Sequence, residues 1–150
     1  MKKEIRHQLS FPHPPEVVWE YLTRSELLEL WLMKNTFTPV VGAEFQFRTN
    51  PIPSLDFDGI CHCTVLEIVP FKKLSYSWQN GPGNGEITLD SVVTWRLQPT
   101  ATGTDLLLEH TGFDMKKNEA FYNGFTHGWP EKFQKIDELL KEGKHGHTTA

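Results

Sequence analysis

Hydrophobic and polar positions change their period along this chain, and each period predicts a different element. Residues 4–11 alternate apolar and polar side chains, which predicts a half-buried first strand. Its inner side would carry Ile5, His7, Leu9 and Phe11. Residues 14–31 then follow a helical spacing, and a break at Thr23–Ser25 divides them into two short helices, with Ser25 as candidate N-cap of the second.

The long segment 36–113 has the spacing of strands and turns almost throughout. Apolar runs of strand length recur roughly every 10–15 residues between turn signals, which predicts an antiparallel meander. The glycines of residues 79–86, with the sequence QNGPGNGE, fit a flexible hairpin tip. They are not a phosphate-binding loop, because no Lys-Ser/Thr pair or dinucleotide-binding context follows them.

Residues 116–142 return to a helical period. One apolar stripe runs along this segment and consists of Phe121, Phe125, Trp129, Phe133, Ile136 and Leu140. We expect a kink at the Gly128–Pro130 step, where Gly128 either absorbs the bend or lets the helix approach a sheet closely. We further expect one domain over residues 1–143 and a flexible tail over 144–150.

The order of these elements predicts an α+β fold. An antiparallel sheet with one face in water must cover its other face, and the C-terminal segment is the element long enough to do so. The expected architecture is a curved antiparallel β-sheet wrapped around a long C-terminal α-helix, with two short helices after the first strand. Such packing often leaves a space between the concave sheet and the helix, where a small ligand would bind.

Composition narrows the function classes. The chain has 150 residues, 38% of them hydrophobic and 23% charged, which is typical of a globular protein. A net charge of −4 argues against nucleic-acid binding. No apolar run reaches about 20 residues, and the N-terminal residues lack the apolar core of a secretory signal, so we expect a cytoplasmic protein without a membrane span. No cofactor motif is recognisable.

Two cysteines, Cys61 and Cys63, flank His62 in a segment that is predicted to be a strand. Their side chains would share one face at a separation awkward for a disulfide, so we expect two small thiols that are partly buried and reduced. His62 would point to the opposite face, so the three residues cannot converge on a metal ion. We predict no metal site.

The sequence EHTGF near the end of the meander raises the question of catalysis. Glu109 and His110 are adjacent in a strand and face opposite ways, so they form no acid–base pair with each other. If Leu106, Leu108 and His110 share the inner face, His110 lies near the ligand space and could transfer protons. The alternative, which we favour, is that His110 orders the corner between strand and helix through hydrogen bonds. Gly112 would relax the backbone there, with Phe113 filling the core.

No side-chain set forms a recognisable catalytic constellation, so no catalytic residue is predicted. The candidates for a cavity lining are mostly aromatic. For any single one of them we favour a place in the packed core, but together they favour an apolar or aromatic ligand. They are Phe45, Phe47, His62, Tyr76, Trp78, Trp95, His110, Phe121, Tyr122, Phe125 and Trp129. Phe133 adds to the aromatic set, and Asn118 and His127 are further polar candidates.

Five stretches in this order resemble one known superfamily: PPEVVWEYLT, ELLELWL, VLEIVPFKKLSYSW, GTDLLLEHTGF and the GW of the last helix. They are similar to the START-like helix-grip superfamily (SRPBCC), and within it to the branch related to the C-terminal domain of the activator of heat-shock protein 90 ATPase. The resemblance covers roughly residues 5–142. Trp31 stands at the position of the bulky residue that ends the second helix, although Leu32 follows it instead of a second Trp.

The resemblance implies several functions. Members of the superfamily hold lipids, hormones or polyketides in a cavity, and some cyclise or dehydrate them. We therefore expect a binding protein for an apolar small molecule without catalysis of its own. The alternatives are a cyclase or dehydratase that uses His110 or Tyr76 as an acid–base group, and a protein-interaction module that contacts the heat-shock chaperone.

Overall fold

The computed structural model describes residues 2–143, so the predicted tail at 144–150 lies outside the described residues. Seven strands form one antiparallel sheet within this range: β1 (Lys2–Phe11), β2 (Lys34–Asn35), β3 (Glu44–Arg48), β4 (Ile60–Val69), β5 (Lys73–Asn80), β6 (Leu89–Pro99) and β7 (Thr104–Asp114). The helices of the same range are α1 (Pro15–Thr23), α2 (Ser25–Trp31) and α3 (Glu119–Lys141), with a 3-10 turn, η1, at Pro53–Leu55.

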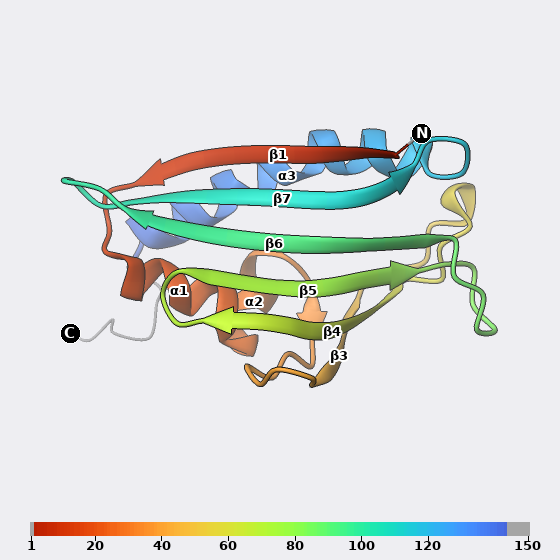
Figure 1. The fold of residues 1–150 in the computed structure, drawn as a ribbon, viewed down its shortest axis with the longest axis horizontal. Coiled ribbons are helices and arrows are strands. Elements are labelled where there is room, and N and C mark those ends of the chain that lie inside the picture. The colour runs from red at the N-terminus through yellow and green to blue at the C-terminus, as the bar shows by residue number, and fades with distance from the viewer. Residues whose placement is uncertain (1, 144–150) are drawn as a thin grey trace.

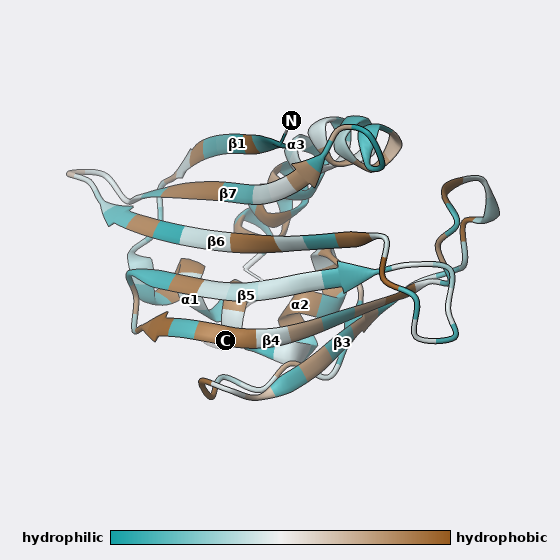
Figure 2. Ribbon diagram, turned by 45° about the vertical axis from the view of Figure 1, so that its right-hand side comes forward, coloured by the Kyte–Doolittle hydropathy of each residue, from teal (hydrophilic) through white to brown (hydrophobic). Residues whose placement is uncertain are grey.

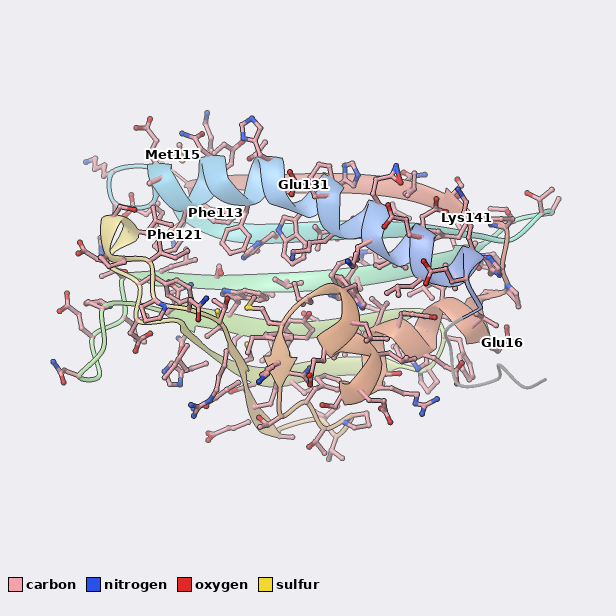
Figure 3. All side chains as sticks on the ribbon, turned by 180° about the vertical axis from the view of Figure 1, so that it is seen from behind. Glu16, Phe113, Met115, Phe121, Glu131 and Lys141 are labelled. Carbon is pink, nitrogen blue, oxygen red and sulfur yellow. The ribbon has the colours of Figure 1, made fainter. Side chains whose placement is uncertain are left out.

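The sheet order is β1-β7-β6-β5-β4-β3-β2, and every neighbouring pair is antiparallel. Strands β3 to β7 form the predicted meander, and β1 joins it beside β7 (Figure 1). The helices lie behind the sheet in that view, with α3 nearest to β1 and β7 and the pair α1–α2 nearest to the other half. Seen from behind, α3 runs along the sheet above α1 and α2 (Figure 3). The predicted helix-grip α+β fold is confirmed.

Apolar and polar colours alternate along the long strands in Figure 2, as expected for a sheet with one covered face. The buried residues of β7 include Leu106, Leu108 and His110, which confirms the predicted inner face. Glu109 lies on the outer face, where its carboxylate accepts a hydrogen bond from Arg96 Nε at 2.8 Å.

The strand alternation of β7 is interrupted at Gly112. Its φ is +104°, and the β1 pairing shifts there, since Lys3 pairs with Phe113 but Glu4 pairs with Thr111. The extra residue is a β-bulge that reverses which side chains face inward. Phe113 is consequently fully buried, three residues after His110, as the prediction of a core-filling Phe113 requires.

Helix α3 is continuous from Glu119 to Lys141 and contains Pro130. The buried members of its stripe include Phe121, Trp129 and Phe133, and Phe125 is half-buried. The prediction for Ser25 was wrong: it is the first helical residue of α2, and its hydroxyl donates to Asn35 Oδ1 at 2.8 Å instead of capping the helix.

Candidate functional site

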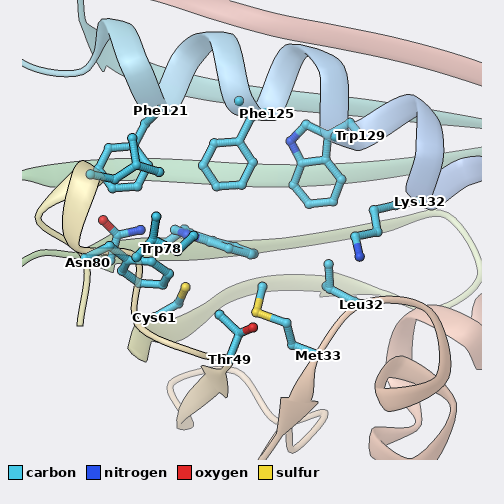
Figure 4. Close-up of a pocket in the computed structure, with 15 residues that line it drawn as sticks. Leu32, Met33, Thr49, Cys61, Trp78, Asn80, Phe121, Phe125, Trp129 and Lys132 are labelled. Atoms are coloured by element: carbon cyan, nitrogen blue, oxygen red, sulfur yellow. The ribbon is translucent and has the colours of Figure 1, made fainter. Parts of the chain in front are cut away.

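A pocket of about 320 Å³ opens between α3, the concave face of the sheet and the segment around η1 (Figure 4). Its size lies within the range of small-molecule sites, about 300–1,000 Å³. The lining comes from four separate parts of the chain: Leu32 and Met33 after α2; Thr49, Ile52, Leu55 and Phe57 around η1; Cys61, Trp78 and Asn80 on β4 and β5; and Phe121, Gly124, Phe125, Gly128, Trp129 and Lys132 on α3.

One wall of the pocket is a row of aromatic rings on α3. Phe121, Phe125 and Trp129 follow one another at a spacing of four residues, so a helix places them on one face. The rings are close to parallel: Phe121 and Phe125 are 6.5 Å apart at 26°, and Phe125 and Trp129 are 5.7 Å apart at 21°. Trp78 from β5 meets Phe125 edge-on at 5.6 Å. Such a wall suits a flat apolar molecule.

The α3 side of the pocket stays open because two of its residues are glycines. A Cβ added at Gly124 or Gly128 would have no heavy atom within 4 Å, apart from the chain neighbours and the helix itself. The sequence-based interpretation of Gly128 as a point of close approach between helix and sheet was therefore wrong. These glycines instead leave space for an occupant.

At the sheet end of the pocket, two buried polar atoms have no hydrogen-bond partner among the described residues. They are Trp78 Nε1, a donor, and Asn80 Oδ1, an acceptor. Both residues are inaccessible to solvent, with relative exposures of 0% and 1%. The other polar group there is the Cys61 thiol, and burial raises its pKa to about 12 although contacts with Asn80 and Trp78 partly oppose the shift. The thiol does not meet hydrogen-bond geometry with either unpaired atom, and a thiol is in any case a weak hydrogen-bonding group.

Lys132 lies at the opposite end of the lining from Asn80, with its amine turned toward Leu32 (Figure 4). It is half-buried, and no ion pair or hydrogen bond joins it to any residue of the described range. No Asp or Glu lines the pocket within that range. The pocket therefore has apolar walls, an uncompensated positive charge at one end and unpaired polar atoms at the other.

His110 belongs to a closed hydrogen-bond chain beside the pocket. Its Nδ1 accepts from Trp129 Nε1 at 3.2 Å, so Nε2 carries the proton and donates to Ser91 Oγ at 2.9 Å. Ser91 Oγ in turn donates to the Trp78 carbonyl at 2.8 Å. Burial lowers the pKa of His110 to about 3, so the ring is neutral. His110 is a hydrogen-bonded core residue, as the favoured interpretation has it, but the predicted position of those bonds was wrong: they join β7 to β6 and to the middle of α3 and do not order the strand–helix corner.

Tyr76, the other acid–base candidate, is also held in the core. Its hydroxyl accepts a hydrogen bond from Trp95 Nε1 at 3.0 Å. Burial raises the pKa of Tyr76 well above its ordinary value, so it does not ionise near neutral pH. Both groups lack an open path to a substrate, because neither lines the pocket.

The structure divides the predicted site residues into three groups. Trp78, Phe121, Phe125 and Trp129 line the pocket together. A second group is packed in the core beside it: Phe45, Phe47, Tyr76, Trp95, His110 and Phe133.

The third group lies elsewhere. His62 is exposed on the outer face, because the buried Cys61 and Cys63 on either side of it point inward. Tyr122 is half-buried against Phe113, and its ring lies 5.5 Å below the Lys3 amine.

The two further polar candidates have structural positions. Asn118 precedes α3, where its Oδ1 accepts from the Asp114 N–H at 3.0 Å and its Nδ2 donates to the Thr88 carbonyl at 2.8 Å. His127 is exposed on α3. Neither lines the pocket.

The family model described as "Activator of Hsp90 ATPase homolog 1-like protein" matches residues 12–141. The chain belongs to this family. No curated protein matches it.

Solved structures support the same family and fold. Protein MLL2253 from Mesorhizobium loti is 38% identical, with a TM-score of 0.82, and the match covers 93% of this chain and 98% of that one. The Aha1 dimer from Colwellia psychrerythraea is 20% identical, with a TM-score of 0.75 and coverage of 95% and 98%. DynU16, from the dynemicin biosynthetic locus, is 20% identical with a TM-score of 0.76, and the match covers 93% of this chain but 48% of that one. At 20% identity these last two likenesses show the fold alone.

Within residues 2–143, no three His, Cys, Asp or Glu side chains are grouped so that they would hold a metal ion. None of the helices there has the length and hydrophobicity needed to cross a bilayer.

Several residues that line the pocket were not predicted from the sequence. Leu32, Met33 and Lys132 follow no pattern that distinguishes them from ordinary surface or core positions. The glycines of α3 did carry a signal, because Gly124 and Gly128 stand four residues apart on the aromatic face of a helix, where alanine would be favoured in a filled core.

Proposed function

We propose that this protein binds a flat, apolar small molecule in the pocket beneath α3. The observation that carries the proposal is the row of near-parallel rings of Phe121, Phe125 and Trp129 facing an open space of about 320 Å³. Family membership supports a domain of the ligand-binding type.

We propose that the protein binds its ligand without catalysing a reaction. The two acid–base candidates of the fold, His110 and Tyr76, are neutral, buried and already hydrogen-bonded to Trp129 and Trp95. Activating either as a general acid or base would require breaking a buried hydrogen bond. We also propose a cytoplasmic location, where the two free thiols stay reduced.

The test is a titration with naphthalene, followed by amide chemical shifts in NMR and by tryptophan fluorescence. The expected result is saturable binding, with the shifts confined to residues 121–132 and to the segments that face them. Quenching should be strong because Trp78 and Trp129 line the site. Shifts scattered over the outer face of the sheet, or none at the solubility limit of naphthalene, would refute the proposal.

A matched pair of variants separates pocket binding from surface adsorption. In Gly128→Leu the new side chain enters the open space, so binding should be lost while the helix is retained. In Asn123→Leu the same side chain is added at an exposed position of α3 that is not part of the lining, so binding should be unchanged. Equal binding by the two variants would place the ligand elsewhere.

A second candidate function is contact with the heat-shock chaperone named in the family description. Val40 and Val41 are adjacent and 57% and 58% exposed, in the loop between β2 and β3. Contiguous exposed apolar surface marks many protein–protein contact sites. The measurement is the ATPase rate of the chaperone with the wild-type protein and with a Val40→Ser, Val41→Ser variant. No stimulation by wild type, or equal stimulation by both, would rule out a contact through this loop.

A further inference from the structure

The two ends of the pocket differ in chemistry, and this difference restricts the ligand. We propose that the ligand, within the proposed binding function, is a flat hydroxy acid: its hydroxyl lies against Trp78 and Asn80, and its carboxylate lies against Lys132. The inference rests on the proposed function for the existence of binding and goes beyond it in naming the ligand class.

The unpaired polar atoms on β5, Trp78 Nε1 and Asn80 Oδ1, are the reason for assigning a hydroxyl to the ligand. Three other buried tryptophans of this core have N–H partners: Trp31 donates to the Tyr21 carbonyl at 2.8 Å, Trp95 to Tyr76 and Trp129 to His110. Trp78 has none within residues 2–143. A buried N–H without a partner costs about 1–3 kcal/mol, so a bound group that accepts from it is favoured.

Asn80 decides which polar group fits. Its Oδ1 is an unpaired acceptor in the same part of the pocket as the Trp78 donor. An ether, a ketone or a carboxylate can accept from Trp78 but cannot donate to Asn80. A hydroxyl can do both with one oxygen.

The unpaired amine of Lys132 is the reason for assigning a carboxylate to the ligand. Its neighbours on the same helix face, three and four residues away, are Trp129, Gly128, Lys135 and Ile136, so no acidic side chain of α3 is in position to pair with it. It borders an apolar space, where an ion pair is stronger than in open water. Because Figure 4 places Lys132 and Asn80 at opposite ends, the two polar groups belong at opposite ends of the ligand.

The proposal is tested by calorimetric titration of the full chain with naphthalene and three of its derivatives. They are naphthalene, 2-naphthol, 2-naphthoic acid and 6-hydroxy-2-naphthoic acid, which share one ring system and differ in the two polar groups. We expect the hydroxyl to tighten binding about fivefold and the carboxylate about tenfold. The molecule with both groups should bind tightest.

Two variants test which residue causes each increase in affinity. Trp78→Phe keeps an aromatic ring but removes the N–H, so 2-naphthol should lose its advantage over naphthalene. Lys132→Met keeps the apolar stem, so 2-naphthoic acid should lose its advantage, whereas the control Lys135→Met, an exposed lysine outside the lining, should not change it. The wild-type comparison stands even if Trp78→Phe fails to fold.

The outcomes separate the two proposals. If all four compounds bind the wild type equally, the hydroxy-acid inference is overturned and the apolar pocket remains. If the polar compounds bind more tightly but Lys132→Met and Trp78→Phe keep that advantage, the assignment to these residues is overturned. If no compound binds, the proposed function fails together with the inference.

Discussion

His110 makes the stability of this protein depend on pH in a way that one substitution can isolate. Burial lowers its pKa in the folded protein to about 3, whereas the ordinary value is 6.5. Between these values the unfolded chain binds a proton that the folded protein excludes. The contribution of His110 is therefore complete above pH 6.5 and is lost progressively as pH falls toward 3.

The size of the effect follows from these two pKa values. Each pH unit between them changes the free energy of unfolding by about 1.4 kcal/mol. At pH 5 the unfolded state gains about 2 kcal/mol from protonation of this one ring, and at pH 7.5 it gains almost nothing. This is a large fraction of the 5–15 kcal/mol that is typical of whole domains.

The assay is urea unfolding of the wild type and of His110→Gln at several values between pH 7.5 and pH 5. The Gln amide can still donate to Ser91, but Trp129 loses its acceptor, so the variant should be about 1–3 kcal/mol less stable at pH 7.5. The gap between the two proteins should shrink by about 2 kcal/mol at pH 5, because the variant has no ring to protonate.

All other titrating groups are common to both proteins and cancel in the difference. His7→Gln serves as the control. Burial lowers the pKa of His7 as well, but His7 is only half-buried, so the stability difference between wild type and His7→Gln should change less with pH. Parallel stability curves for wild type and His110→Gln would refute the reasoning. So would an NMR titration in which the His110 ring protonates near pH 6.5.

Two other predictions concern the thiols and the glycines. Because burial raises the pKa of Cys61 to about 12 and that of Cys63 further, the native protein should react with iodoacetamide at pH 8 far more slowly than the urea-unfolded chain; a fast native thiol would contradict this. Gly112→Ala should cost roughly 1–3 kcal/mol in thermal unfolding, because the new Cβ would lie 2.9 Å from the Asp90 carbonyl oxygen at a positive φ. The matched Gly128→Ala should instead gain up to about 1 kcal/mol, and equal effects would argue against the bulge.

Much of the fold was predictable because its signals are local. Strand alternation and helical spacing depend on residues within a few positions of one another, so the meander, the two short helices and the C-terminal helix could be inferred from sequence. The same reasoning placed His110 on the inner face and Glu109 on the outer face, and it applied equally to His62 between two inward cysteines. Including His62 among the cavity candidates ignored that alternation.

The sequence by itself determined the order of elements, the side of each strand that is buried and the aromatic stripe of α3. Only the tertiary structure decided which buried polar groups find partners. Trp129 reaches His110, and Trp78 reaches no acceptor, although both are tryptophans on inward faces. The tertiary structure also decided where α3 crosses the sheet and leaves an open space beside Gly124 and Gly128. Periodicity specifies the direction of a side chain from its own backbone, whereas a pocket depends on how segments distant in sequence fill or fail to fill one volume.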